Sequence, residues 1–254
     1  MNKTIKYAAI VSAACAAFAV RPALAFDIGG LVGAGGKMVQ AATLSDNDIK
    51  QLSDKACAQS DKEEKLAASG SKYDVRVQKL GKQLGNNING QPVNYKVYIT
   101  SDVNAWAMGN GCIRVYSGLM DMMNDDELLG VIGHEMGHVA LGHSKKAMQT
   151  AYTVSAARDA AASAGGSAVA ALNSSQLGDL TEKFVNAQFS QSQESAADDY
   201  SFDKLKKAGL PTQGLVTAFQ KLAKLDGGKS SMMSSHPSST KRAEHIQERI
   251  ASNK

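Results

Sequence analysis

Apolar residues recur three or four positions apart along most of this 254-residue chain, which is the spacing of one buried face of a helix. The pattern predicts helices over residues 45–69, 73–88, 179–207, 213–225 and 239–251. Between the third and fourth of these, glycine and proline interrupt the pattern, as they do where a helix ends. The chain is therefore predicted to be predominantly α-helical.

The hydrophobic pattern changes between Asn94 and Ser117, where residues typical of strands replace the helical spacing. Three short strands are predicted, over 95–100, 105–108 and 113–116, and Gly109-Asn110-Gly111 separates the last two. This pattern predicts a small antiparallel sheet that contains a hairpin and packs on the following helix. The expected fold class is α+β with few strands.

The next helix begins at Asn124, which can cap it, and Glu127 completes a capping-box pattern. Apolar residues then occur on several sides of the helix as far as Leu141. A helix that is apolar on several sides is expected to be buried.

This predicted helix contains the sequence His134-Glu135-Met136-Gly137-His138. Residues four positions apart project from the same face of a helix, so His134 and His138 can bind one metal ion together. Glu135 lies beside them and can move a proton on a bound water. The pentapeptide is the core of a zinc peptidase site, with two structural histidines as the alternative.

A catalytic zinc ion usually has three protein ligands and one open position. In one known completion a glycine and a third histidine follow the motif, but Leu141 and Ser144 stand at those positions here, and His143 is one residue out of register. Glu194, from a later helix, is therefore predicted as the third ligand. Asp198 lies one turn after it and is expected to hold a ligand histidine in its metal-binding tautomer.

The N-terminus has the features of a secretory signal peptide over residues 1–25. Two lysines precede an apolar run that is too short for a good membrane span, and Ala23-Leu24-Ala25 forms a cleavage site before Phe26. An exported, periplasmic protein is expected, and a lipid anchor to the outer membrane through Cys15 is the alternative. Residues 26–70 are interpreted as a glycine-rich leader and a helix, and residues 71–254 as the catalytic domain.

The net charge and the cysteines bear on the binding partners and on the disulfide content of the protein. The formal charge is +4, and removing the three basic residues of the signal leaves +1 for residues 26–254. There is no basic stripe interleaved with aromatic residues, so a nucleic-acid partner is not expected. Cys57 and Cys112 remain after export, and an even pair in an exported protein predicts a disulfide, with two free buried thiols as the alternative.

Several of these segments, in this order, resemble the HtpX-like zinc metallopeptidases, a family that includes the CAAX prenyl endopeptidases, and within it the exported bacterial LoiP-type members. The matching segments are Asn104-Ala105, the pentapeptide with His143, Glu194 with Ala197-Asp198, and Ser235-His236-Pro237 with Arg242. They cover roughly residues 70–250. The resemblance implies a gluzincin-type fold and a zinc-dependent endopeptidase that acts on polypeptides.

The resemblance also implies a role for each matching residue. His134, His138 and Glu194 would bind one zinc ion, and Glu135 would be the catalytic acid and base. Asn104 and Ala105 would lie on an edge strand that aligns the substrate backbone. Arg242 would form a buried ion pair that holds the last helix, and His143 would support the ligands or the fold.

His236 has two possible roles and an ordinary alternative. It could stabilise the oxyanion, it could block the site before substrate arrives, or it could be a turn histidine before a proline. Residues 155–178 and 226–236 could act as lids. The expected substrates are exported or misfolded envelope proteins, and the alternative function is a catalytically silent zinc protein, either chaperone-like or an accessory of the outer membrane.

Overall fold

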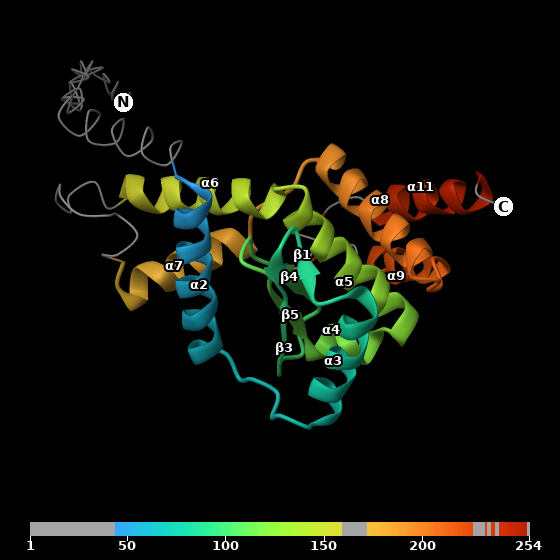
Figure 1. Ribbon diagram of the computed structural model, residues 1–254, viewed down its shortest axis with the longest axis horizontal. Coiled ribbons are helices and arrows are strands. Elements are labelled where there is room, and N and C mark those ends of the chain that lie inside the picture. Colours follow the sequence, from blue (N-terminus) through green and yellow to red (C-terminus); the bar gives the residue numbers. More distant parts are fainter. Residues whose placement is uncertain (1–43, 159–171, 226–231, 233–234, 237–238, 253–254) are drawn as a thin grey trace, which may run out of the picture.

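The computed structural model describes residues 44–158, 172–225, 232, 235–236 and 239–252 (Figure 1). The predicted signal peptide, Cys15 and the glycine-rich leader as far as residue 43 lie outside these residues. The helices are α2 (Asp46–Glu63), α3 (Lys72–Leu84), α4 (Ser117–Met122), α5 (Asp125–Ala140), α6 (His143–Arg158), α7 (Ser174–Val185), α8 (Gln191–Lys207), α9 (Gln213–Ala223) and α11 (Ser239–Ser252). None of the described helices is both long and apolar enough to cross a membrane.

The strands are β1 (Asn87–Ile88), β2 (Gln91–Pro92), β3 (Asn94–Tyr98), β4 (Ala105–Ala107) and β5 (Cys112–Tyr116). The predicted hairpin is confirmed as the antiparallel pair β4–β5, with Ala105 opposite Val115. The expectation of an antiparallel sheet is wrong for the other pair, because β3 pairs with β5 in parallel in the order β3-β5-β4. β5 is the central strand and runs in the same direction as β3. β4 forms one edge of the sheet and runs in the opposite direction.

The helix predicted over 73–88 ends earlier, at Leu84. Gly85 follows with φ +93°, a backbone conformation that ends the helix. The next residues form the tight hairpin β1–β2, whose turn residues Asn89 and Gly90 both have positive φ. An Asn-Gly pair is the sequence most typical of such a turn.

Helix α5 lies between the sheet and the helices α8, α9 and α11 (Figure 1). Its predicted N-terminus is confirmed, since Asn124 and Glu127 form a complete capping box. All of its residues from Glu127 to His138 are buried, as its apolar pattern predicts. The pentapeptide predicted to bind a metal ion is therefore enclosed in the core.

Two hydrophobic clusters cover opposite faces of the three-stranded sheet. Ala105, Ala107 and Val115 join the cluster around α5, whereas Tyr98 and Trp106 join a second cluster with α2, α6 and α7. The predicted disulfide is confirmed, because Cys57 of α2 is bonded to Cys112 of β5. The boundary predicted at residue 70 stays a prediction, and the disulfide links the segments before and after it.

The segment between α5 and α8 holds more helix than the sequence indicates. In the segment 155–178, which the sequence offers as a possible lid, residues as far as Arg158 belong to α6 and those from Ser174 onward to α7. Residues 159–171 lie outside the described part. The single helix predicted over 179–207 is two helices, because Ser190 and Gln193 form a capping box that begins α8.

Small residues allow α5 and α8 to pack closely. A Cβ atom added at Gly137 would lie 2.9 Å from the carbonyl oxygen and 3.0 Å from the Cα atom of Ala197. One added at Gly133 would lie 2.5 Å from the hydroxyl of Ser201, which donates a hydrogen bond to the Gly130 carbonyl. The two helices can therefore approach only because these α5 positions lack side chains.

We expect Gly137→Ala to lower the free energy of unfolding by about 1–3 kcal/mol, because the new methyl group meets backbone atoms that cannot rotate away. Denaturant unfolding followed by circular dichroism measures the change. The matched control is Gly178→Ala on α7, where the nearest atom is the flexible end of the Glu63 side chain at 3.4 Å. That variant should be neutral or gain about 0.5–1 kcal/mol, and equal stabilities of the two variants would contradict the account.

Candidate metal centre

His134 and His138 are one turn apart on α5, and both rings are buried. Their Nε2 atoms lie 3.0 Å apart. The two nitrogens are therefore turned toward the same position beside α5, as the spacing of the pentapeptide predicts.

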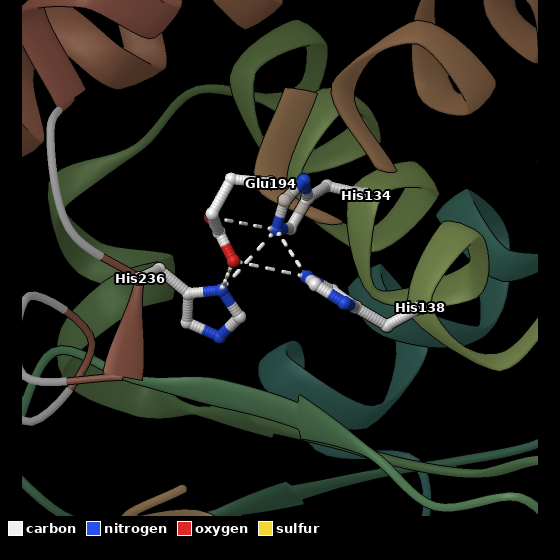
Figure 2. A group of neighbouring side chains, drawn as sticks. All are labelled: His134, His138, Glu194 and His236. Carbon is white, nitrogen blue, oxygen red and sulfur yellow. Dashed lines mark hydrogen bonds and ion pairs between the residues drawn. The ribbon is translucent and has the colours of Figure 1, made fainter. Parts of the chain in front are cut away.

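Glu194 lies in the first turn of α8, which places its carboxylate beside the two imidazoles (Figure 2). Its Oε1 is 3.3 Å from Nε2 of His138, and its Oε2 is 3.6 Å from Nε2 of His134. A tetrahedral zinc ion with bonds of about 2.0–2.1 Å would hold its ligand atoms about 3.3 Å apart. The spacing of these two nitrogens and the carboxylate oxygens thus fits a zinc ion.

His236 is the fourth side chain of this cluster. Its Nδ1 is 3.0 Å from Oε1 of Glu194 and 3.3 Å from Nε2 of His134. The four donor atoms, one from each of His134, His138, Glu194 and His236, all lie within 4.8 Å of one another. The interpretation of His236 as an ordinary turn residue is therefore wrong, since it is buried against the predicted ligands.

Asp198 and Arg242 form hydrogen bonds and ion pairs with His134 and Glu194 of the cluster. Oδ1 of Asp198 is 2.7 Å from Nδ1 of His134, so that nitrogen donates its proton and leaves Nε2 free to bind a metal. The Arg242 guanidinium donates to both Asp198 oxygens, at 2.8 and 2.6 Å, and its Nη1 lies 2.7 Å from Oε2 of Glu194. Arg242 also lies over the ring of Phe219, 4.1 Å from its centroid. The expected buried ion pair is confirmed, and it joins α11 to α8.

His143 and Phe189 form the wall of the site beside His138. Nδ1 of His143 is 3.1 Å from Nδ1 of His138, and the Phe189 ring stacks on His138 with 3.9 Å between centroids. Phe189 was not predicted as a site residue, because position 189 falls inside the helix predicted over 179–207. The capping sequence that begins at Ser190 is the signal that could have separated it from α8.

The charges of the cluster suit a cation. Burial lowers the pKa of both ligand histidines, and the Arg242 charge adds to the effect at His134. Burial raises the pKa of Glu194, but the charge of His236 and the hydrogen bond from His138 outweigh it and hold that pKa well below its usual range. Neutral imidazoles beside an ionised carboxylate are the protonation states that metal binding requires.

Glu135 differs from Glu194, because burial raises its pKa to about 7 and nearby cations only partly offset this. Oε1 of Glu135 is buried and makes no hydrogen bond to any described residue. Burial lowers the pKa of His236, but the charges of Glu194 and Glu135 outweigh it and raise that pKa. A buried carboxylate oxygen without a hydrogen-bond donor, beside the ionised Glu194, fits a site for one divalent ion.

Asn104 and Ala105 lie at the start of the edge strand β4, as expected from the resemblance. The Asn104 side-chain oxygen accepts a hydrogen bond from the Ala105 amide, while its buried Nδ2 makes no hydrogen bond to a described residue. β4 contacts α5, the helix that carries His134 and His138.

Comparison with known proteins gives consistent results. Residues 71–250 match the model of peptidase family M48. The chain is 60% identical over 216 residues to Metalloprotease YcaL of Escherichia coli (strain K12), covering 85% of each chain. It is 58% identical over 226 residues to Metalloprotease LoiP of the same organism, covering 89% of each. A 50-residue segment is 46% identical to Protease HtpX of Thioalkalivibrio sulfidiphilus, covering 18% of this chain and 17% of that protein.

We expect Asp198→Asn to weaken zinc binding about 10–100-fold, because the amide no longer fixes the His134 tautomer with a full negative charge. Competition with a zinc-selective chelator measures the affinity without any activity assay. The control is Asp199→Asn, whose half-exposed carboxylate contacts His245 and Arg249 instead. Equal zinc affinities of the two variants would rule out the role of Asp198.

Proposed function

Since the chain belongs to peptidase family M48 and is a metalloprotease, we propose that His134, His138 and Glu194 bind its zinc ion and that Glu135 is the general base. The convergence of two imidazole nitrogens from α5 and one carboxylate from α8, with nitrogen–nitrogen and nitrogen–oxygen distances of 3.0–3.6 Å, carries this proposal. Glu135 follows the proposed ligand His134 in the sequence, yet its side chain is not part of the four-residue cluster. The Glu135 carboxylate is thus available for proton transfer.

When bound, the zinc ion supplies a Lewis acid that activates water and polarises the peptide carbonyl. Glu135 takes the proton of the attacking water through Oε1, which no described residue occupies with a hydrogen bond. The same carboxyl group then gives the proton to the departing amine nitrogen. Asp198 and Arg242 keep His134 and Glu194 in place throughout.

The substrate backbone lies along β4 in this proposal. An edge strand offers unpaired backbone groups to an extended peptide, which adds to the sheet as a further strand. The position of Asn104 and Ala105 supports this, because Ala105 begins the edge strand and Asn104 directly precedes it. A peptide bound in this way can extend past the metal centre in both directions, so cleavage would occur inside the chain. This is the endopeptidase activity expected from the sequence.

Exported or misfolded envelope proteins are the proposed substrates, and the periplasm is the proposed location. The signal-like N-terminus and the disulfide between Cys57 and Cys112 support an oxidising compartment. Attachment to the outer membrane through Cys15, or association with envelope proteins, stays an alternative. A catalytically silent zinc protein is less favoured, because a pure binder has no use for Glu135.

His236 acts, in this proposal, as a block on the metal centre. The amide of Met232 donates to the Val103 carbonyl at 3.4 Å, and the amide of Phe189 donates to the Ser235 carbonyl at 3.2 Å. These bonds hold the described residues of 232–236 between the start of the edge strand and Phe189. His236 then lies where the open position of a catalytic zinc ion is expected (Figure 2).

We expect Glu135→Gln to keep the fold and one zinc ion per chain but to lower the rate of casein cleavage about 10²–10⁴-fold, because an amide cannot accept the proton. Metal analysis and the cleavage assay are made on the same preparation. Glu244→Gln, at an exposed position of α11, is the control and should retain full activity. Undiminished cleavage by Glu135→Gln would remove Glu135 from the mechanism.

We expect His236→Ala to raise kcat toward a short quenched fluorescent peptide severalfold, because the blocking imidazole is gone while all three proposed ligands remain. His245→Ala on α11, where the ring contacts Asp199, is the control and should leave kcat unchanged. A fall in kcat of tenfold or more would instead support the oxyanion role of His236, at a cost of about 1.4 kcal/mol or more in transition-state stabilisation.

A further inference from the structure

A groove with a volume of about 640 Å³ lies between α9 and α11, which pack side by side (Figure 1). The apolar residues that line it follow the spacing of one helix face on each helix: Val216 and Ala223 on α9, and Ala243 and Ala251 on α11. Because alanine side chains are small, a helix of another molecule can approach such a surface closely. The groove is thus suited to helix packing.

The two helices run antiparallel along the groove. The side chain of Gln213, the first residue of α9, donates a hydrogen bond to the Gln247 side chain of α11 at 3.3 Å. Further along α9, the Phe219 ring lies against the guanidinium of Arg242, which precedes Gln247 in α11. The contacts of α9 therefore move back toward the start of α11 as α9 proceeds.

The two ends of the groove carry opposite charges. Lys224 directly follows α9 and so lies at the end where α11 begins, whereas Glu248 lies beside the start of α9. Both side chains line the groove, are exposed, and form no ion pair with any described residue. Glu244, one turn before Glu248, also lines the groove and is exposed. The groove therefore offers a cation at one end and carboxylates toward the other.

The groove faces away from the metal centre. Arg242, which donates to Asp198, is two positions before Glu244 on α11. At 3.6 residues per turn, the two side chains project about 200° apart around the helix axis. A molecule bound in the groove therefore does not cover the metal-binding residues.

We propose that this groove is the interface between two copies of the chain, related by a two-fold axis that crosses the groove at right angles. Such an axis reverses the direction of the groove, so the Lys224 end of each copy meets the Glu248 end of the other. The same pair of charges then forms at both ends of the interface. A two-fold axis along the groove would instead bring Lys224 opposite Lys224, which charge repulsion disfavours.

A second copy fits the groove better than a partner of one charge sign. A basic or an acidic helix would be attracted at one end and repelled at the other, whereas the reversed copy matches both ends. In the dimer, α9 and α11 of each copy pack on those of the other, as helices do in a four-helix bundle. A two-fold contact of this kind is closed, so assembly stops at two chains.

The test is the sedimentation of the purified, zinc-loaded protein at concentrations of about 1–100 µM. We expect the wild-type protein to be a dimer at the upper end of this range. Lys224→Glu and Glu248→Lys each place like charges at both ends of the interface, so each should weaken dimerisation about tenfold or more. Lys82→Glu, at an exposed position of α3 outside the groove, is the charge-matched control and should dimerise like the wild type.

A mixture of the two variants tests the reciprocal contact itself. When one Lys224→Glu chain meets one Glu248→Lys chain, glutamate faces lysine at both ends. The mixture should therefore form heterodimers about as readily as the wild type forms dimers, although each variant alone associates weakly. Fluorescence-detected sedimentation with one labelled variant measures this, and an ion pair within one chain could not produce the recovery.

A wild-type protein that stays monomeric at about 100 µM would overturn the proposal and leave the groove to a different partner. A dimer that Lys224→Glu does not weaken, or a mixture no more associated than its components, would also overturn it, because the copies would then meet elsewhere. Both substituted residues are exposed, and circular dichroism checks that each variant is folded. Since no cleavage is measured, the result is independent of the proposed roles of the metal ligands and Glu135.

Discussion

The close contact between α5 and α8 is the constraint on which the metal centre depends. Two histidines on α5 can meet a carboxylate of α8 only if the backbones approach closely, and Gly133 and Gly137 provide the space opposite Ser201 and Ala197. The ion pair of Arg242 with Asp198 then fixes α11 on the same side. Buried ion pairs gain little net stability, so this one is better understood as setting the geometry of the ligands.

Several elements surround that centre. The sheet presents β4 as an outer edge, and the described residues around His236 lie between this edge and Phe189. A groove along α6 is lined by His143 and Phe189. Phe189 thus stacks on the proposed ligand His138 and lies next to the residues of the proposed block, in a connection between two helices where small movements are least costly.

Sequence reasoning recovered the parts of the structure that depend on local patterns. The capping box at Asn124, the buried character of α5 and the hairpin β4–β5 follow from neighbouring residues. The parallel pairing of β3 with β5 does not, because strand order is set by tertiary packing rather than by period. Glu194, about sixty residues after the pentapeptide, could be found only from the need for a third ligand. Phe189 was missed because the predicted helix over 179–207 runs through it, and only the capping pattern that begins at Ser190 separates it from α8.

X-ray absorption and anomalous diffraction at the zinc edge, on crystals of the zinc-loaded protein, test the central claim most directly. The account predicts one zinc ion bound by Nε2 of His134, Nε2 of His138 and the Glu194 carboxylate, with bonds of about 2.0–2.2 Å. An ion held elsewhere, or held by the histidines while Glu194 turns away from it, would contradict the account.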